Sequence, residues 1–123
     1  MPKRILIVDD EPSILMAFSK LLKRPGIDVD TAQTMGAAEA LLDQNKYDAA
    51  IVDLRLTGVI GEEGLEIIKY IKEITPQTHV ILVTGYGSPD VMAKTQALGA
   101  AFYFEKPVSG ETLRNALASL GVQ

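Results

Sequence analysis

Five short apolar runs alternate with stretches of helical periodicity along this 123-residue chain, and the alternation restricts the folds it can adopt. The runs cover residues 4–8, 27–31, 47–52, 79–83 and 101–104. In the stretches after them, apolar residues recur every three or four positions, which is the spacing of one helix face. Strict alternation of strand and helix predicts an α/β fold, a five-stranded parallel sheet doubly wound in the flavodoxin-like strand order 2-1-3-4-5, with helices on both faces.

Residues typical of helix ends support this reading. Thr34, Ser88 and Ser109 stand where the second, fourth and fifth helices would begin, and their hydroxyl groups can accept hydrogen bonds from the unpaired amides there. Gly26 and Gly99 stand where helices would end, a position at which glycine favours left-handed backbone. The punctuation therefore agrees with five strand–helix units.

Length and composition favour one soluble, cytoplasmic domain over residues 1–123, with no separate output domain. The chain has room for one core, and 47% of its residues are hydrophobic. A net charge of −4 argues against direct binding of nucleic acid, and the absence of cysteine excludes disulfides and suits a reducing compartment. The first apolar run is too short for a signal peptide, and no run could span a membrane. Whether the chain stands alone or is part of a longer regulator stays open.

Acidic residues and a lysine follow the predicted strands at one end. Asp9 and Asp10 follow the first strand, Asp53 the third, Thr84 the fourth and Lys106 the fifth. Because the carboxyl ends of parallel strands open onto one crevice, we expect these side chains to meet in space. Carboxylates beside a lysine and a hydroxyl suit a hard divalent cation, Mg²⁺, and a phosphoryl group.

Taken singly, these residues are unremarkable, since an acid at a strand end often shapes a turn or caps a helix, and a lone lysine is usually solvated. Their coincidence at one sheet edge changes the reading. Crowded carboxylates repel one another and cost stability, and a bound Mg²⁺ would remove that cost. Lys106 would add a charge for a phosphoryl oxygen, and Gly85 after Thr84 would leave space for its approach.

Four segments of the chain resemble the receiver domain of bacterial two-component response regulators. In order they are ILIVDDEP, YDAAIVDLRL, VTGYGS and YFEKP, and together they reach across nearly the whole chain. The wording of VTGYGS and LGAAFYFEKP is most similar to receivers of the nitrogen-regulation type. The resemblance implies a phosphoacceptor domain of two-component, or phosphorelay, signal transduction, which is no enzyme beyond catalysing its own phosphorylation and dephosphorylation.

The resemblance also implies a role for each site residue. Asp53 would accept the phosphoryl group from a phosphohistidine of a sensor histidine kinase or phosphotransfer protein. Asp10, Asp53 and the backbone carbonyl of Arg55 would bind Mg²⁺, and Asp9 would contribute through water. Lys106 would contact the phosphoryl group.

A switch is implied as well. Thr84 would move toward the new charge, and Tyr103 would rotate into the space behind it. The face of the fourth helix, fifth strand and fifth helix would then bind a downstream effector, and phosphorylation-dependent homodimerisation is compatible with the resemblance. Arg55 and Tyr86 would tune the lifetime of the aspartyl phosphate, and Pro107 would follow a cis peptide bond.

Several positions depart from the family pattern or stand outside it. Thr57 occupies a position usually held by proline, and the stretch TGVIGEEG is about three residues longer than usual on the family resemblance. Phe102 replaces a common acid, and we expect it to be buried rather than exposed. His79, the only histidine, is expected to be an ordinary strand-end residue.

Two other functions are compatible with parts of this pattern. A Mg²⁺-dependent phosphatase with an aspartyl nucleophile would usually carry Asp-x-Asp after the first strand together with a cap domain, and neither is seen. A phosphorylation-independent binding module with a receiver-like fold would not need the full set of site residues. That set therefore favours an active receiver.

Overall fold

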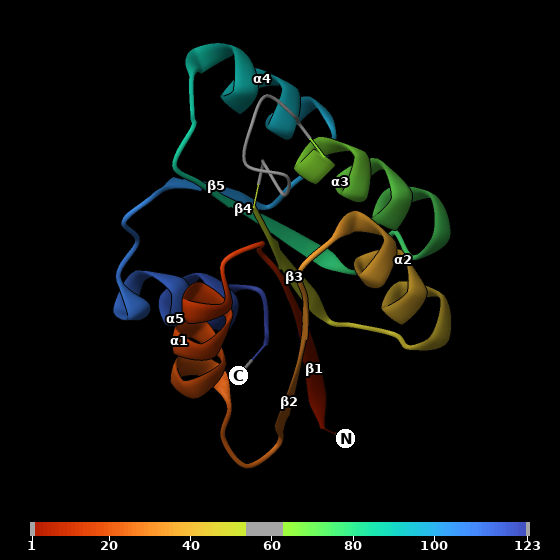
Figure 1. The fold of residues 1–123 in the computed structure, drawn as a ribbon, viewed down its shortest axis with the longest axis vertical. Helices are drawn as coiled ribbons and strands as arrows, with labels where there is room; N and C mark the ends of the chain where they lie inside the picture. Colours follow the sequence, from red (N-terminus) through yellow and green to blue (C-terminus); the bar gives the residue numbers. More distant parts are fainter. Residues whose placement is uncertain (1, 54–62, 123) are drawn as a thin grey trace.

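The computed structural model describes residues 2–53 and 63–122 (Figure 1). The strands are β1 (Lys3–Val8), β2 (Ile27–Ala32), β3 (Ala49–Val52), β4 (His79–Thr84) and β5 (Phe102–Glu105). The helices are α1 (Pro12–Leu22), α2 (Met35–Gln44), α3 (Glu63–Ile74), α4 (Pro89–Ala97) and α5 (Gly110–Ser119). Among the described residues, no helix is long and apolar enough to cross a membrane.

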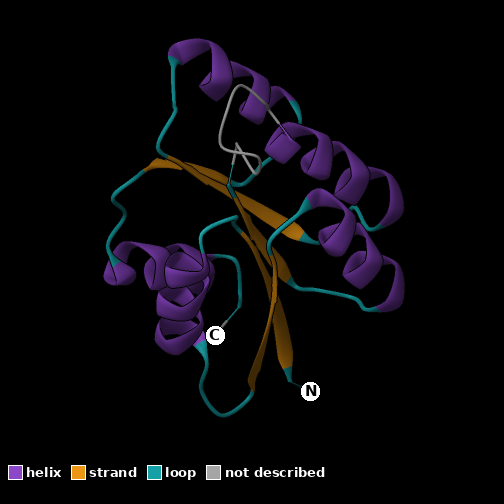
Figure 2. Cartoon of the chain, in the orientation of Figure 1, coloured by secondary structure: helices purple, strands orange, loops and turns teal. Residues whose placement is uncertain are grey.

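The strands form one sheet in the order β2-β1-β3-β4-β5, and every neighbouring pair is parallel. Helices α1 and α5 cover one face of the sheet, while α2, α3 and α4 cover the other (Figures 1 and 2). The predicted fold class and strand order are therefore confirmed. The chain reverses its direction of winding between β1 and β3, which is where ligands bind in sheets of this kind.

Two hydrophobic clusters hold the helices to the sheet, one on each face. Alternate strand residues supply them: Ile5, Ile51 and Ile81 face α1 and α5, whereas Leu6 and Leu82 face α2, α3 and α4. All five are at most 2% exposed. Because β1, β3 and β4 are buried on both faces, their sequences are continuous apolar runs rather than alternating patterns.

The expected N-caps are in place. The side-chain oxygens of Thr34, Ser88 and Ser109 accept hydrogen bonds of 3.0–3.1 Å from amides three residues further along. Gly99 follows the C-cap of α4 with a φ of 88°, as expected of a glycine that ends a helix. Gly26 also has a positive φ, 86°, but it lies in the turn before β2, because α1 ends at Leu22 with Lys23 as its C-cap. Each capping hydroxyl satisfies an amide that the helix itself leaves unpaired.

Strand β3 begins at Ala49, two residues later than the sequence pattern predicts. Residue Tyr47 lies before it because its carbonyl accepts a hydrogen bond of 2.6 Å from the Thr78 hydroxyl instead of joining the sheet. Its side chain is 4% exposed and donates its hydroxyl to Asp30 on β2 at 2.6 Å. Tyr47 therefore ties the start of β3 to the edge strand.

Replacing Tyr47 by phenylalanine is expected to lower the free energy of unfolding by about 1–2 kcal/mol at pH 7, because the Asp30 carboxylate loses its donor. Burial, followed by the hydrogen bond and charge of Asp30, raises the pKa of the Tyr47 phenol above its ordinary value of 10.0. The protonated phenol thus stabilises the fold below pH 10, and that contribution is lost as the pH rises toward the raised pKa. Urea denaturation at neutral and alkaline pH measures both effects.

Asp30→Asn is the matched control, since an amide oxygen can still accept the Tyr47 hydroxyl and the loss should be smaller than for Tyr47→Phe. An equal stability of wild type and Tyr47→Phe would show that this buried hydrogen bond contributes nothing net.

Phe102 and His79 both lie in strands of the sheet. Phe102 is half-buried on the face covered by α1 and α5, and its ring stacks on Phe104 with centroids 5.6 Å apart. It contributes to the core without being fully enclosed, because β5 is an edge strand. His79 is the first residue of β4, as expected of a strand-end residue.

Candidate functional site

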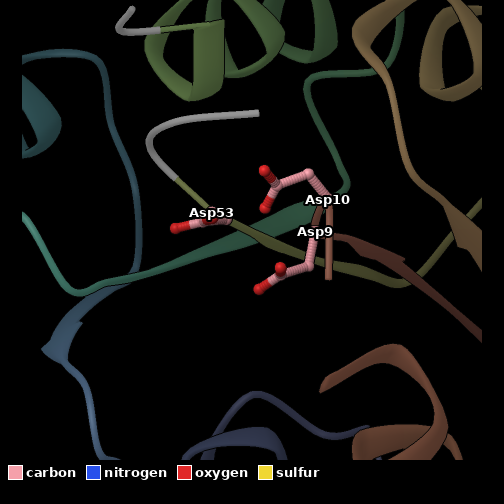
Figure 3. A group of neighbouring side chains, drawn as sticks. All are labelled: Asp9, Asp10 and Asp53. Carbon is pink, nitrogen blue, oxygen red and sulfur yellow. The ribbon is translucent and has the colours of Figure 1, made fainter. Parts of the chain in front are cut away.

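The carboxyl ends of β1 and β3 bring three aspartates together (Figure 3). Val8 and Val52 are paired in register, so Asp9 and Asp53 leave the sheet side by side. The Asp53 amide donates to the Val8 carbonyl at 2.9 Å, which extends the ladder past the strand and fixes the position of Asp53. Each of Asp9, Asp10 and Asp53 offers a carboxylate oxygen, and these atoms lie within 4.8 Å of one another.

Asp9 and Asp53 are only 3% and 5% exposed, whereas Asp10 is half-buried. Three carboxylates crowded in this way repel one another, and burial strengthens the repulsion by excluding water. The donor set consists of carboxylate oxygens alone, which is what a hard divalent cation prefers. The arrangement therefore fits a cation such as Mg²⁺ or Ca²⁺ on the grounds of both charge and ligand type.

Lys106 brings a positive charge from the end of β5 to the same cluster. Its Nζ lies 2.9 Å from Asp9 Oδ2 and 3.7 Å from Asp53 Oδ1. Burial lowers the pKa of Lys106, but the hydrogen bond to Asp9 and the charges of Asp53, Asp9 and Glu11 outweigh it and leave the pKa raised above 10.5. The ammonium group is thus held in its charged form beside the carboxylates.

Both carboxylate oxygens of Asp9 accept hydrogen bonds from other residues of the protein. One of its oxygens accepts the Lys106 hydrogen bond, and the other accepts the backbone amide of Glu11 at 2.9 Å. The second bond also fixes the start of α1, whose cap residue Glu11 makes no capping bond of its own. Asp9 therefore positions Lys106 and the loop, while Asp10 and Asp53 complete the group of acids.

Thr84 ends β4 and is fully buried. Its hydroxyl oxygen accepts the backbone amide of Tyr86 at 3.0 Å, which directs the hydroxyl into the loop between β4 and α4. Tyr86 itself is 50% exposed. The backbone of Lys106 is tied to the same strand end, since its amide donates to the Thr84 carbonyl at 2.8 Å.

Tyr103 lies on β5, with its ring packed against the cluster beneath α3 and α4. Its hydroxyl donates to Glu105 Oε2 at 3.2 Å. Burial, then the hydrogen bond and charge of Glu105, raise the pKa of Tyr103. Sequence reasoning missed Glu105, although its place two residues after Tyr103 on one strand puts both side chains on the same face.

The remaining expectations have mixed outcomes. The Lys106–Pro107 peptide bond is cis, as expected. A Cβ built on Gly85 would meet no described atom within 4 Å, so the space beside this glycine is open, and its role in the approach of a phosphoryl group stays a prediction. Arg55, Thr57 and the stretch TGVIGEEG lie outside the described residues apart from its last two positions, Glu63 and Gly64, which begin α3.

A doubly wound parallel sheet with clustered acids and a lysine at its carboxyl edge defines a phosphoryl-accepting signalling domain of the receiver type. The family model described as the response regulator receiver domain matches residues 5–118. The chain therefore belongs to the receiver domain family of response regulators, a signalling family in two-component systems.

Individual relatives support the assignment. The chain is 38% identical over 94% of its length to the alginate biosynthesis transcriptional regulatory protein AlgB of Pseudomonas aeruginosa, and it spans 25% of that protein. A receiver domain protein from Methanospirillum hungatei has a TM-score of 0.88 and 30% identity, over 98% of this chain and 95% of the other. A Burkholderia pseudomallei response regulator, described with a phosphorylated aspartic acid, calcium ion and citrate, has a TM-score of 0.84 and 28% identity, over 94% and 66% of the two chains.

Proposed function

We propose that the protein accepts a phosphoryl group on the Asp53 carboxylate from a phosphohistidine of a sensor histidine kinase or phosphotransfer protein. An oxygen of Asp53 would bond to phosphorus as the bond from phosphorus to the imidazole nitrogen breaks. The single observation that carries this proposal is the grouping of three carboxylate oxygens within 4.8 Å, with Lys106 Nζ hydrogen-bonded to one aspartate and 3.7 Å from Asp53. Such a transfer needs positioning and neutralisation of charge more than covalent chemistry.

Mg²⁺ is the cation we propose for this site. It favours a few carboxylates, retained waters and a phosphate oxygen, and it would neutralise charge on the phosphoryl group. Asp10 and Asp53 are the proposed direct ligands, because both oxygens of Asp9 are already engaged and leave it to act through water. The backbone carbonyl of Arg55 completes the proposed set on the strength of the family resemblance.

Lys106 is proposed to bind a phosphoryl oxygen, exchanging its contact with Asp53 for the new charge. Thr84 is proposed to move toward that charge, giving up its bond with the Tyr86 amide. Arg55 and Tyr86 are proposed to set the lifetime of the acyl phosphate, which the domain would hydrolyse itself. In this proposal the chain acts on no other substrate.

The output would pass through α4, β5 and α5. In the parallel pairing of β4 with β5, Leu82 lies opposite Tyr103 and Thr84 lies opposite Glu105. A shift of Thr84 would therefore change the packing of side chains on the neighbouring edge strand. Rotation of Tyr103 would change this face and with it the affinity for a downstream effector or a second receiver. We also propose that residues 1–123 act as one receiver unit in the cytoplasm, which the family match over residues 5–118 supports.

Mg²⁺ is expected to raise the melting temperature, because it binds the folded arrangement of carboxylates and not the unfolded chain. At about ten times its Kd the stabilisation would be about 1.4 kcal/mol, or roughly 4–8 °C for a domain of this size. Asp10→Asn should remove most of this shift. Calorimetric scans with and without Mg²⁺ measure it.

Asp28→Asn is the matched control. Asp28 is exposed and lies opposite Arg4 in the β1–β2 register, toward the end of β1 that is far from the acids. It removes the same charge and should leave the Mg²⁺ shift intact. An identical melting temperature with and without Mg²⁺ in the wild type would count against the cation site.

The function itself is tested by incubating the protein with Mg²⁺ and acetyl phosphate and measuring the intact mass. Addition of one phosphoryl group is the expected result. No addition to a folded protein that binds Mg²⁺, from acetyl phosphate or a phosphorylated kinase, would indicate a binding module that has lost its chemistry.

A further inference from the structure

The Tyr103 hydroxyl lies against Glu105 and Gly87, two residues outside the phosphoryl site. Tyr103 and Glu105 are two apart on β5, and they pair in register with Leu82 and Thr84 of β4. All four side chains therefore stand on the sheet face covered by α3 and α4. Glu105 lies directly beside Thr84, and its carboxylate accepts the Tyr103 hydroxyl at 3.2 Å.

Gly87, in the loop before α4, lies beside both the Tyr103 hydroxyl and the Glu105 carboxylate. A Cβ built on Gly87 would lie 1.9 Å from the Tyr103 hydroxyl oxygen and 2.2 Å from Glu105 Oε2. Gly87 is not among the glycines with positive φ, so its backbone does not require glycine. The missing side chain is needed for space, because the hydroxyl and the carboxylate both lie over the bare Cα.

These contacts belong to the rotamer of Tyr103 seen in this structure, in which the hydroxyl lies against Glu105 and Gly87. Rotation toward the space behind Thr84 would carry the hydroxyl away from both Glu105 and Gly87. An interaction present in one of two states shifts the equilibrium between them by its own free energy, and the effect is reciprocal with any ligand that prefers the other state. The strength of this contact therefore sets how readily the receiver switches.

We propose that Glu105 and Gly87 are positioning residues that hold Tyr103 in the rotamer seen here and so keep the unphosphorylated receiver switched off. The inference rests on the proposed function, because it assigns a regulator to the proposed switch residue Tyr103. Because this hydrogen bond is exposed and 3.2 Å long, removal of the Glu105 acceptor is expected to raise the inward population of Tyr103 about twofold. The affinity for a phosphoryl analogue should rise by the same factor.

Ring resonances of labelled tyrosine test the position of Tyr103 in unphosphorylated protein, and Tyr103→Phe identifies its signal among the four tyrosines. In Glu105→Ala the Tyr103 resonances should move toward those of the protein saturated with beryllofluoride and Mg²⁺. Gly87→Ala should do the same, because a Cβ only 1.9 Å from the hydroxyl oxygen forces the ring of Tyr103 to move. Glu105→Gln should stay close to wild type, since its amide oxygen still accepts the hydroxyl.

Beryllofluoride affinity in the presence of Mg²⁺ is the second readout, with Glu111→Ala as the control for loss of an exposed acid from the neighbouring helix α5. Glu105→Ala and Gly87→Ala should bind about twofold more tightly than wild type, whereas Glu111→Ala should not. Equal shifts in Glu105→Gln and Glu105→Ala would overturn the proposal by showing that charge, not the hydrogen bond, is responsible.

The two proposals fail in different ways. If wild type binds beryllofluoride but Tyr103 keeps its resonances in both Glu105→Ala and Gly87→Ala, the positioning role is wrong and the receiver function stands. If wild type binds no beryllofluoride while the Tyr103 resonances differ from wild type in Glu105→Ala and Gly87→Ala but not in Glu105→Gln, the contact of Tyr103 is real and the phosphoryl site is wrong.

Discussion

An Asp53→Asn variant is expected to lose phosphoryl uptake completely while becoming more stable than the wild type in metal-free buffer. The amide has the shape of the carboxylate but no anionic oxygen to form an acyl phosphate, so the stoichiometry should fall from one to zero. Removing one of three crowded negative charges should add about 1 kcal/mol to the free energy of unfolding without Mg²⁺. Intact mass after acetyl phosphate treatment and urea denaturation measure the two effects.

The opposite signs make this variant informative, because a simple unfolding defect would lower uptake and stability together. Asp28→Asn again serves as the control, since it lies away from the cluster and should change neither quantity. Uptake at full stoichiometry in Asp53→Asn would mean that another residue is the acceptor.

Replacing Lys106 by glutamine is expected to have the second largest effect. The Asp9 carboxylate, 4% exposed at its side chain, would lose its charged partner at 2.9 Å, and the free energy of unfolding should fall by about 2–3 kcal/mol at pH 7. Phosphoryl uptake should slow by about 10²-fold or more, the typical cost of one lost donor to developing negative charge. Added Mg²⁺ should restore part of the stability but not the rate.

The pH dependence follows from the raised pKa of Lys106. A lysine whose pKa lies above 10.5 in the folded state contributes its full stability below that value and loses it as the pH rises through the folded pKa. The stability gap between wild type and Lys106→Gln should thus be constant from neutral pH to about pH 10 and close above it. Lys106→Arg keeps the charge and should keep most of the stability; a gap that is absent at pH 7 would show that the ion pair contributes nothing.

The site was predictable from the sequence because strand register, not side-chain detail, brings its members together. Once β1 and β3 are parallel neighbours, the residues after Val8 and Val52 must lie side by side, whatever the rotamers of Asp9 and Asp53. The fold followed from the same periodicity, since buried strands and amphipathic helices leave a clear pattern.

Other features could not be read in this way. The contact of Tyr103 with Glu105 over Gly87 depends on one rotamer and on the path of a loop, and neither has a periodic signal. The late start of β3 depends on the Thr78 hydroxyl competing for the Tyr47 carbonyl. Each is decided by a tertiary contact, which single-sequence patterns do not contain.

The unequal burial of the sheet has a consequence for how such a domain can diversify. The strands that carry the acids are enclosed on both faces, so most substitutions there would create cavities and lower stability. Strand β5, which carries Tyr103 and Glu105, has no fully buried residue. Substitutions in the strands beneath the acids therefore lower stability, whereas substitutions on β5, which carries the proposed switch, should disturb the core less. Descendants of one such chain could acquire new thresholds and new recipients while the phosphoryl chemistry stays the same.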